Sequence, residues 1–196
     1  MVSSNFSTSG FLLLKDVNIH EDVKRFLLDL NYSLLTLFNM NQIKHNFIQV
    51  SEVDALNNIS EVVQRNISIA VSLNRSLVSV LYDESKNMPS FLKLITCSDL
   101  HDKISRLLNA AITRIGKDSV GMRIDLPSEN KYATQAHQEF PSFPYALNGV
   151  VAWICLTKTT KGTGGINIAP GSHKLGVLSL EGNLAEQNKR LEQGDL

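Results

Sequence analysis

Hydrophobic residues recur at helical spacing through about the first 115 positions of the chain. Apolar side chains stand three and four residues apart from His20 onward, and again between residues 53 and 81. Such spacing gives a helix one apolar face, so it predicts helices that pack around a common core. Pro89 interrupts the second pattern, and Asp99 is a candidate N-cap for a further helix. The predicted inward positions are Val23, Phe26, Leu27, Leu30, Leu34, Leu37 and Phe38, then Val53, Leu56, Ile59, Val63, Ile67, Ala70, Leu77 and Leu81, then Leu100, Ile104, Leu107, Leu108 and Ala111.

The pattern changes after Gly116. Short apolar runs at 119–126, 150–156, 164–170 and 174–180 alternate with turn residues such as Pro, Gly and Asn-Gly. Short strands separated by turn signals are typical of a β-sandwich or jelly roll. The expected fold class is therefore α+β, with a double-stranded β-helix (jelly roll) core and a helical N-terminal half. The expected organisation is a helical region at 1–115 that packs on the sheet, and a partial jelly-roll core at 116–196.

Composition narrows the class of partner. Lys plus Arg and Asp plus Glu number 19 each, so the formal net charge is zero, and no basic run marks a nucleic-acid surface. The N-terminus lacks a basic signal-peptide region, and no apolar segment has the length of a membrane span. Cys97 and Cys155 lie far apart in apolar segments, as free thiols do in a reducing compartment. These features predict a cytoplasmic protein that binds neither nucleic acid nor a membrane.

The stretch "YATQAHQEFPSF" carries the strongest candidate chemistry. His137 and Glu139 stand two residues apart, so on a strand their side chains would share one face. Together with a second histidine they would make a 2-His-1-carboxylate triad, which holds Fe(II) and leaves coordination positions open. On spacing alone, a His–Glu hydrogen bond at a solvated strand edge is the favoured interpretation.

Four motifs occur in a recognisable order: "HQEF", "GVVAWICL", "KGTGG" and "APGSHKLG". The run from Met122 to Leu178 thereby resembles the phytanoyl-CoA dioxygenase family of Fe(II)/2-oxoglutarate-dependent oxygenases. The resemblance implies a jelly-roll core, Fe(II) and 2-oxoglutarate as cofactors, and dioxygen and a small organic molecule as substrates. The activity it implies is hydroxylation, although nothing in the sequence identifies the substrate or the oligomeric state.

The resemblance also implies roles for particular residues. His137 and Glu139 would be iron ligands, with Glu139 standing where Asp is commoner. Gln138, the middle residue of the motif, would point away from the metal and support the site from behind. Trp153 would lie near the cosubstrate, although its apolar neighbours fit a core tryptophan equally well. Gln135 would line the cosubstrate pocket, whereas for Arg123 a position on the strand surface is the preferred interpretation.

Three explanations are possible for the third iron ligand. In the family a Gly-Asp pair opens the strand that ends in the distal histidine, and an Arg that binds 2-oxoglutarate follows. Gly194 and Asp195 match that pair, so the distal histidine and the arginine are both expected beyond Leu196. The jelly roll is therefore expected to be incomplete. A family member that has lost catalysis is the second possibility. The third is that His173 acts as a ligand, although the resemblance makes its segment a structural turn.

Two functions from different classes therefore follow. The first is an Fe(II)/2-oxoglutarate-dependent dioxygenase, represented here by a fragment that lacks the distal His and the Arg. The alternative is a non-catalytic jelly-roll protein that binds a small molecule or a partner. A cupin-like metal protein is disfavoured, because the sequence contains no His-x-His.

Overall fold

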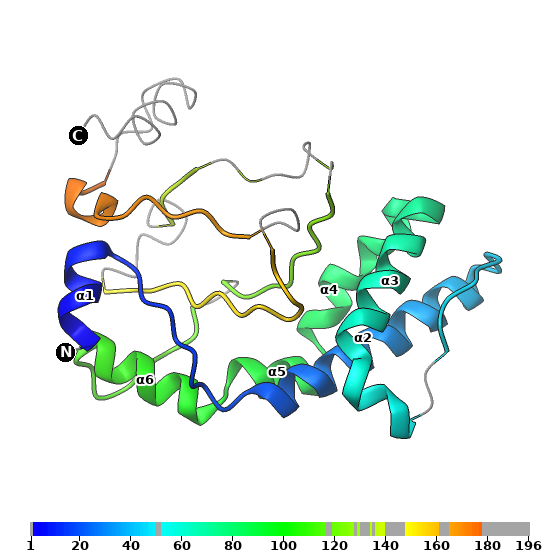
Figure 1. The fold of residues 1–196 in the computed structure, drawn as a ribbon, viewed down its shortest axis with the longest axis horizontal. Helices are drawn as coiled ribbons and strands as arrows, with labels where there is room; N and C mark the ends of the chain where they lie inside the picture. The colour runs from blue at the N-terminus through cyan, green and yellow to red at the C-terminus, as the bar shows by residue number, and fades with distance from the viewer. Residues whose placement is uncertain are drawn as a thin grey trace.

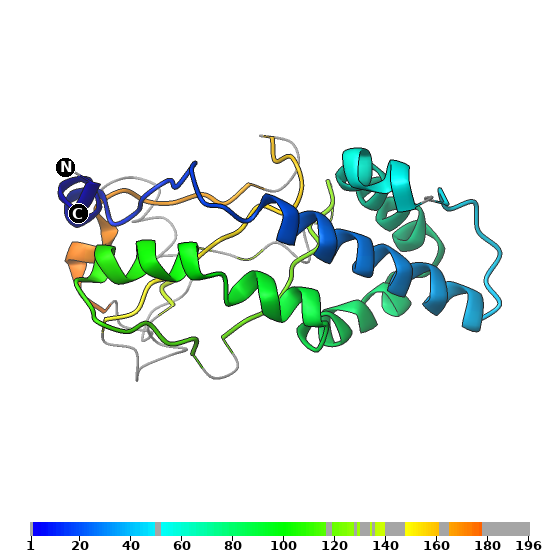
Figure 2. The ribbon, with the colours of Figure 1, turned by 90° about the horizontal axis from the view of Figure 1, so that it is seen from below.

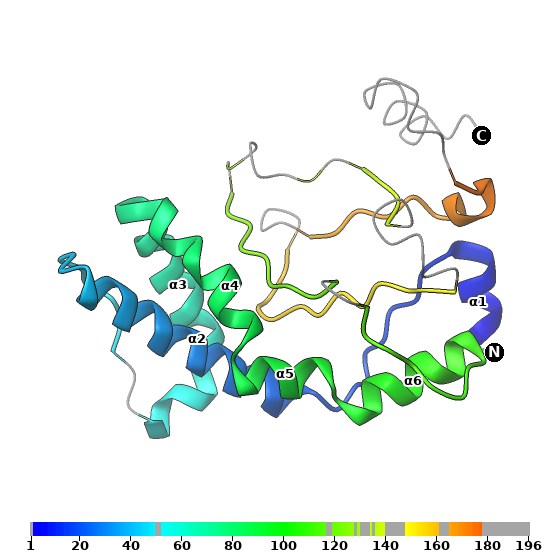
Figure 3. The same ribbon diagram turned by 180° about the vertical axis from the view of Figure 1, so that it is seen from behind.

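The computed structural model describes residues 2–49, 52–116, 119–127, 129, 134, 136–139, 148–160 and 165–177. Its helices, in chain order, are α1 (Val2–Ser9), α2 (His20–Met40), α3 (Glu52–Val78), α4 (Val80–Lys86), α5 (Pro89–Ile95), α6 (Ser98–Leu108) and the short 3₁₀ helix η2 (Ser172–Leu175). Helices α2 to α5 gather at one end of the molecule, and α1, α6 and η2 lie toward the other (Figures 1 and 3).

Helix α2 is the centre of the helical end. It packs against α3, α4 and α5, and this arrangement can be followed from below in Figure 2. The rings of Phe26 and Phe91 contact each other with centroids 5.4 Å apart, which joins α2 to α5. The predicted stripe is confirmed, because its members at the centre of the helix are almost fully buried. These are Phe26, Leu27, Leu30, Leu34 and Phe38.

Helix α3 buries four of the predicted positions, Ile59, Val63, Ile67 and Ala70, whereas the side chains of Val53 and Leu56 lie outside the described part. Its backbone departs from helical geometry at Asn74, with φ −159° and ψ 91°. The Asn74 side chain then accepts a hydrogen bond from the Leu77 amide at 2.9 Å, as a capping residue does where a helix restarts. The chain turns there, and the pattern continues into the separate helix α4.

Helix α6 begins differently from the prediction. Cys97, not Asp99, occupies the N-cap position, and the Asp99 carboxylate accepts hydrogen bonds from the Asn18 amide and the Lys103 ammonium. The helix ends at Leu108, where Asn109 adopts the left-handed conformation (φ 49°) that closes many helices. Ala111, which was predicted to face inward, is exposed.

The predicted jelly-roll core is wrong for the described part of the chain. Residues 119–127, 148–160 and 165–171 contain no strand, and residues 172–175 form η2 instead. The described backbone hydrogen bonds within this half are turn bonds, such as Ser119 to Gly116 and Ser172 to Ala169, and a further bond joins Gly171 to Ser9 near the N-terminus. A sheet needs a ladder of bonds between neighbouring segments, and alternating hydrophobicity does not specify the neighbour. Residues 178–180 of the fourth predicted strand lie outside the described residues.

The alternation itself nevertheless has a structural counterpart. Val120, Met122, Ile124 and Leu126 all pack against the helical core, and Met122 and Ile124 are only 7% exposed. The intervening residues Gly121 and Arg123 are exposed, so side chains of this segment do alternate between core and solvent. Ile154 and Leu156 pack against the same core from a second segment, next to the exposed Trp153.

No helix in the described ranges combines the length and the apolar character that crossing a bilayer requires. The division into regions 1–115 and 116–196 stays a prediction.

Candidate functional site

His137 and Glu139 lie side by side, although the described residues around them form no strand. Nε2 of His137 is 3.3 Å from Oε1 of Glu139, and the two side chains are 47% and 46% exposed. An imidazole nitrogen and a carboxylate oxygen therefore converge at one solvent-accessible point. These donors suit a transition metal such as Fe(II), and the same contact also serves as an ordinary His–Glu hydrogen bond.

Gln138 is held by a different part of the chain. Its side-chain amide donates a hydrogen bond of 2.8 Å to the backbone carbonyl of Gly176, which directly follows η2. The three consecutive motif residues thus make two kinds of contact: Gln138 reaches Gly176, whereas His137 and Glu139 meet each other. The supporting role assigned to Gln138 from the sequence stays a prediction.

No third ligand stands beside the pair in the described part of the chain. All five histidines belong to that part, and no group of three His, Cys, Asp or Glu side chains there is arranged to hold a metal ion. His173 contacts the N-terminal helix instead, with Nε2 3.1 Å from the Ser7 carbonyl oxygen. Gly194 and Asp195 lie outside the described residues.

A hollow of about 470 Å³ is lined by residues of the helical core and of the segments at 119–127 and 152–159. Leu30, Ile67 and Phe91 contribute to its helical wall, and Trp153 and Arg123 to the opposite wall. The described residues that line it include neither His137 nor Glu139. A hollow of this size with mostly apolar walls can accept a small organic molecule.

Arg123 connects the hollow with the motif segment, by which we mean the described residues from Glu129 to Glu139. Its guanidinium group bonds to the hydroxyl of Thr134, shortly before His137, and pairs with Asp125 at 2.8 Å. Its side chain is 38% exposed, although not on a strand, and it also lines the hollow. Gln135, the other predicted lining residue, lies outside the described residues.

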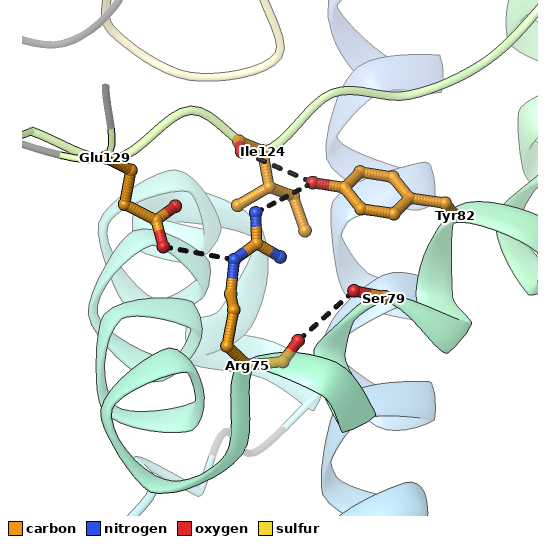
Figure 4. Close-up of polar contacts among 5 residues, drawn as sticks. All are labelled: Arg75, Ser79, Tyr82, Ile124 and Glu129. Atoms are coloured by element: carbon orange, nitrogen blue, oxygen red, sulfur yellow. Dashed lines mark hydrogen bonds and ion pairs between the residues drawn. The ribbon is translucent and has the colours of Figure 1, made fainter. Parts of the chain in front are cut away.

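A second polar cluster, which the sequence did not indicate, ties the motif segment to the helices (Figure 4). Arg75 of α3 pairs with Glu129 at 3.2 Å, and their side chains are only 15% and 20% exposed. The Arg75 guanidinium also donates to the Tyr82 hydroxyl, which in turn donates to the Ile124 carbonyl. Burial disfavours the charge, but the hydrogen bonds to Tyr82 and Glu129 outweigh it and raise the pKa of Arg75 above its usual value.

The motif segment is therefore held at two of its described residues. Glu129 is fixed by Arg75 before the motif, and Gln138 is fixed by Gly176 within it. A donor pair on irregular backbone needs such supports, because no helix or sheet orients its side chains.

These features define a helix-rich protein with a His–Glu donor pair and a neighbouring apolar hollow. A family model for phytanoyl-CoA dioxygenase (PhyH) matches residues 74–193, which is more than half of the chain. The chain therefore belongs to the phytanoyl-CoA dioxygenase family, and the resemblance seen in its motifs is confirmed. No curated protein and no solved structure matches the chain.

Membership indicates a type of function. The family consists generally of oxygenases that use Fe(II) and 2-oxoglutarate, with dioxygen and a small molecule as substrates. The match begins at residue 74, well before the motif run that starts at Met122. It therefore includes α4, α5 and α6 and the Arg75 cluster, for which the sequence offered no recognisable motif.

Proposed function

We propose that this chain acts as an Fe(II)/2-oxoglutarate-dependent oxygenase that hydroxylates a small organic substrate, with His137 and Glu139 as metal ligands. The observation that carries the proposal is the 3.3 Å contact between Nε2 of His137 and Oε1 of Glu139 in a chain of this family. Both donor atoms are accessible, so a metal ion can replace their direct contact without opening the fold.

Different residues of the chain would bind the metal, orient its ligands and bind the substrate. His137 and Glu139 would bind Fe(II), which together with 2-oxoglutarate supplies the oxidising chemistry. Gln138 would orient the pair through its bond to Gly176. Trp153 would offer a flat apolar surface to the cosubstrate, and Gln135 would contribute a polar contact there. The apolar walls of the hollow would bind the substrate and limit the access of water.

The third ligand is a separate question. Nε2 of His173 faces a backbone carbonyl, which only accepts hydrogen bonds, so this nitrogen carries a hydrogen and has no lone pair for a metal. That contact supports a structural role for His173. We therefore expect metal binding to depend on His137 and Glu139 directly, and on His173 only through structure.

The test is an anaerobic titration with Fe(II) and 2-oxoglutarate, following the visible absorption that the two give when bound together. We expect the absorption in the wild-type chain and its loss in His137→Ala and in Glu139→Ala. The exposed residues His20 and Glu61 provide matched controls, and His20→Ala and Glu61→Ala should titrate like wild type. Unchanged absorption in both site variants would place the metal elsewhere.

A non-catalytic small-molecule-binding protein is the second candidate. The observation that favours it is the hollow, whose described lining excludes His137 and Glu139. Such a protein would bind an apolar ligand equally well with and without Fe(II). Absence of the absorption in wild type, combined with metal-independent binding of an apolar fluorescent dye, would favour this candidate over the oxygenase.

A further inference from the structure

The N-terminal helix docks on the turn that contains the Pro-Gly-Ser-His motif. Helix α1 and η2 lie side by side in every view, although they come from opposite ends of the described chain (Figures 1 to 3). The Gly171 amide donates to the Ser9 carbonyl at 2.8 Å. His173 and Ser7, which are 166 positions apart in sequence, are joined by the contact at Nε2 of the imidazole.

Gly10 makes this docking possible for two independent reasons. Its φ is +79°, in the left-handed region that residues with a side chain rarely adopt. A Cβ at this position would lie 2.4 Å from Nδ1 of His173 and 2.9 Å from its Cγ. The imidazole ring therefore sits directly against the Gly10 backbone, and one of its nitrogens faces Gly10 while the other faces Ser7.

The same turn supports the motif from its other side. Gly171 and Gly176 flank η2 with φ values of 81° and 72°, so two left-handed glycines reverse the chain around four residues. The Gly176 carbonyl accepts the hydrogen bond from the Gln138 side chain. One short turn thus contacts α1 through His173 and the motif through Gly176.

We propose that His173 is a positioning residue for the His137–Glu139 pair. The imidazole fastens the turn to α1, the fastened turn holds the Gly176 carbonyl in place, and this carbonyl fixes Gln138. Because Gln138 lies between the two donors, fixing its side chain restricts the backbone from which both donors project. This inference rests on the proposed function, and it assigns α1 to the support of the site.

The contact needs a donor at one place, so a substitute can be specified. The Ser7 carbonyl requires an N–H, which the imidazole provides at Nε2 in the tautomer that the contact selects. The side-chain amide of glutamine can also place an N–H at the end of a side chain of similar length. His173→Gln should therefore retain the docking, whereas His173→Ala should lose it.

The experiment follows two NMR signals and one affinity in the full chain. The exchange rate of the Gly171 amide reports docking of α1, and the side-chain amide signals of Gln138 report the second contact. In His173→Ala and in Gly10→Ala we expect Gly171 exchange to accelerate by about tenfold or more and the Gln138 signals to shift. We also expect Fe(II) with 2-oxoglutarate to bind about tenfold more weakly, which is typical when a residue behind a metal ligand is lost.

Matched controls exist for both substitutions. Gly165 has ordinary backbone geometry, and the nearest atom to an added Cβ is Cγ2 of Thr159 at 3.4 Å, so Gly165→Ala should change none of the readouts. His20→Ala removes an exposed imidazole and should also resemble wild type. His173→Gln should restore Gly171 protection, the Gln138 signals and the affinity. Far-UV circular dichroism checks that each variant retains its helices.

The outcomes separate this inference from the proposed function. If wild type binds no Fe(II) with 2-oxoglutarate, the proposed function fails, and Gln138 signals that stay unchanged in His173→Ala would independently overturn the relay. Faster Gly171 exchange with unchanged Gln138 signals or unchanged affinity would reduce His173 to a structural contact. Loss of binding in His173→Ala and His173→Gln, with full binding in Gly10→Ala, would identify His173 as a ligand and overturn the proposal.

Discussion

Asn66 illustrates how a single polar residue organises the helical core. It is fully buried on α3, and its side chain donates to Oδ1 of the buried Asn31 at 2.9 Å and to the Ile48 carbonyl at 3.0 Å. It also accepts a hydrogen bond from the Ile48 amide at 2.8 Å. One side chain thereby satisfies both backbone groups of a loop residue and joins that loop to α2 and α3. Buried groups of this kind are costly to leave without partners.

We expect Asn66→Ala to lower the free energy of unfolding by about 2–4 kcal/mol, because it leaves the Ile48 amide and carbonyl without their partner. Urea denaturation followed by far-UV circular dichroism measures the change. Arg65→Ala, at an exposed neighbouring position, should remain within about 0.5 kcal/mol of wild type. Equal effects of the two substitutions would show that the buried amide contributes no more than a surface side chain.

At the scale of elements, the first turn of α6 depends on charge. Asp99 accepts a hydrogen bond from the Lys103 ammonium at 2.7 Å and from the backbone amide of Asn18 at 2.8 Å. These two bonds lower the pKa of Asp99 below its usual value, and the bond from Lys103 has the larger effect. A lowered pKa in the folded state means that the ionised carboxylate favours folding. Its contribution is present above the unfolded pKa of about 3.9 and is lost as the pH falls through the lower folded value.

Asp99→Asn should therefore lower the melting temperature at pH 7, and its effect should shrink as the pH falls through the lowered pKa and the wild-type carboxylate itself becomes protonated. Melting curves of both chains across this pH range measure the difference. Asp102→Asn alters an exposed carboxylate of the same helix and should show no comparable loss at pH 7. A wild-type advantage that persists undiminished at the acidic end would contradict the assigned role of the charge.

The sequence predicted elements better than it predicted their pairing. Helical periodicity identified Phe26, Leu30 and Leu34 as core residues, because a helix satisfies its backbone hydrogen bonds within itself. Met122 and Ile124 lie in a run predicted as a strand and do face the core, but a strand also requires a partner, which no local pattern specifies. The described residues supply no such partner, so the jelly roll that the apolar runs predicted is absent from that part of the chain.

In the candidate site, too, contacts between residues close in sequence could be predicted, whereas contacts between distant residues could not. The contact of His137 with Glu139 follows from a spacing of two residues, and the structure contains it. The contacts that support the motif join Gln138 to Gly176, and Glu129 to Arg75. Each of these pairs is distant in sequence and unremarkable in composition. Only the folded chain brings their members together.

At the scale of the whole molecule, the Arg75–Glu129 pair couples the helical end to the segments beyond residue 116. Two probes report these parts separately. Trp153, the single tryptophan, lies in the described segment at 148–160, whereas circular dichroism reports mainly the helices. Arg75 is also tied to that half through Tyr82, whose hydroxyl bonds to the Ile124 carbonyl.

Arg75→Met should therefore move the Trp153 fluorescence transition in urea to lower concentration than the circular dichroism transition, because it leaves the half-buried Glu129 without its cation. The loss should be about 1–3 kcal/mol, the range for hydrogen bonds to charged groups. Arg75→Lys should recover part of it, since it keeps the charge without the planar guanidinium. Lys86→Met breaks the exposed pair with Asp83 within α4 and should leave the two transitions coincident. Coincident transitions in Arg75→Met as well would mean that this ion pair does not couple the two parts of the chain.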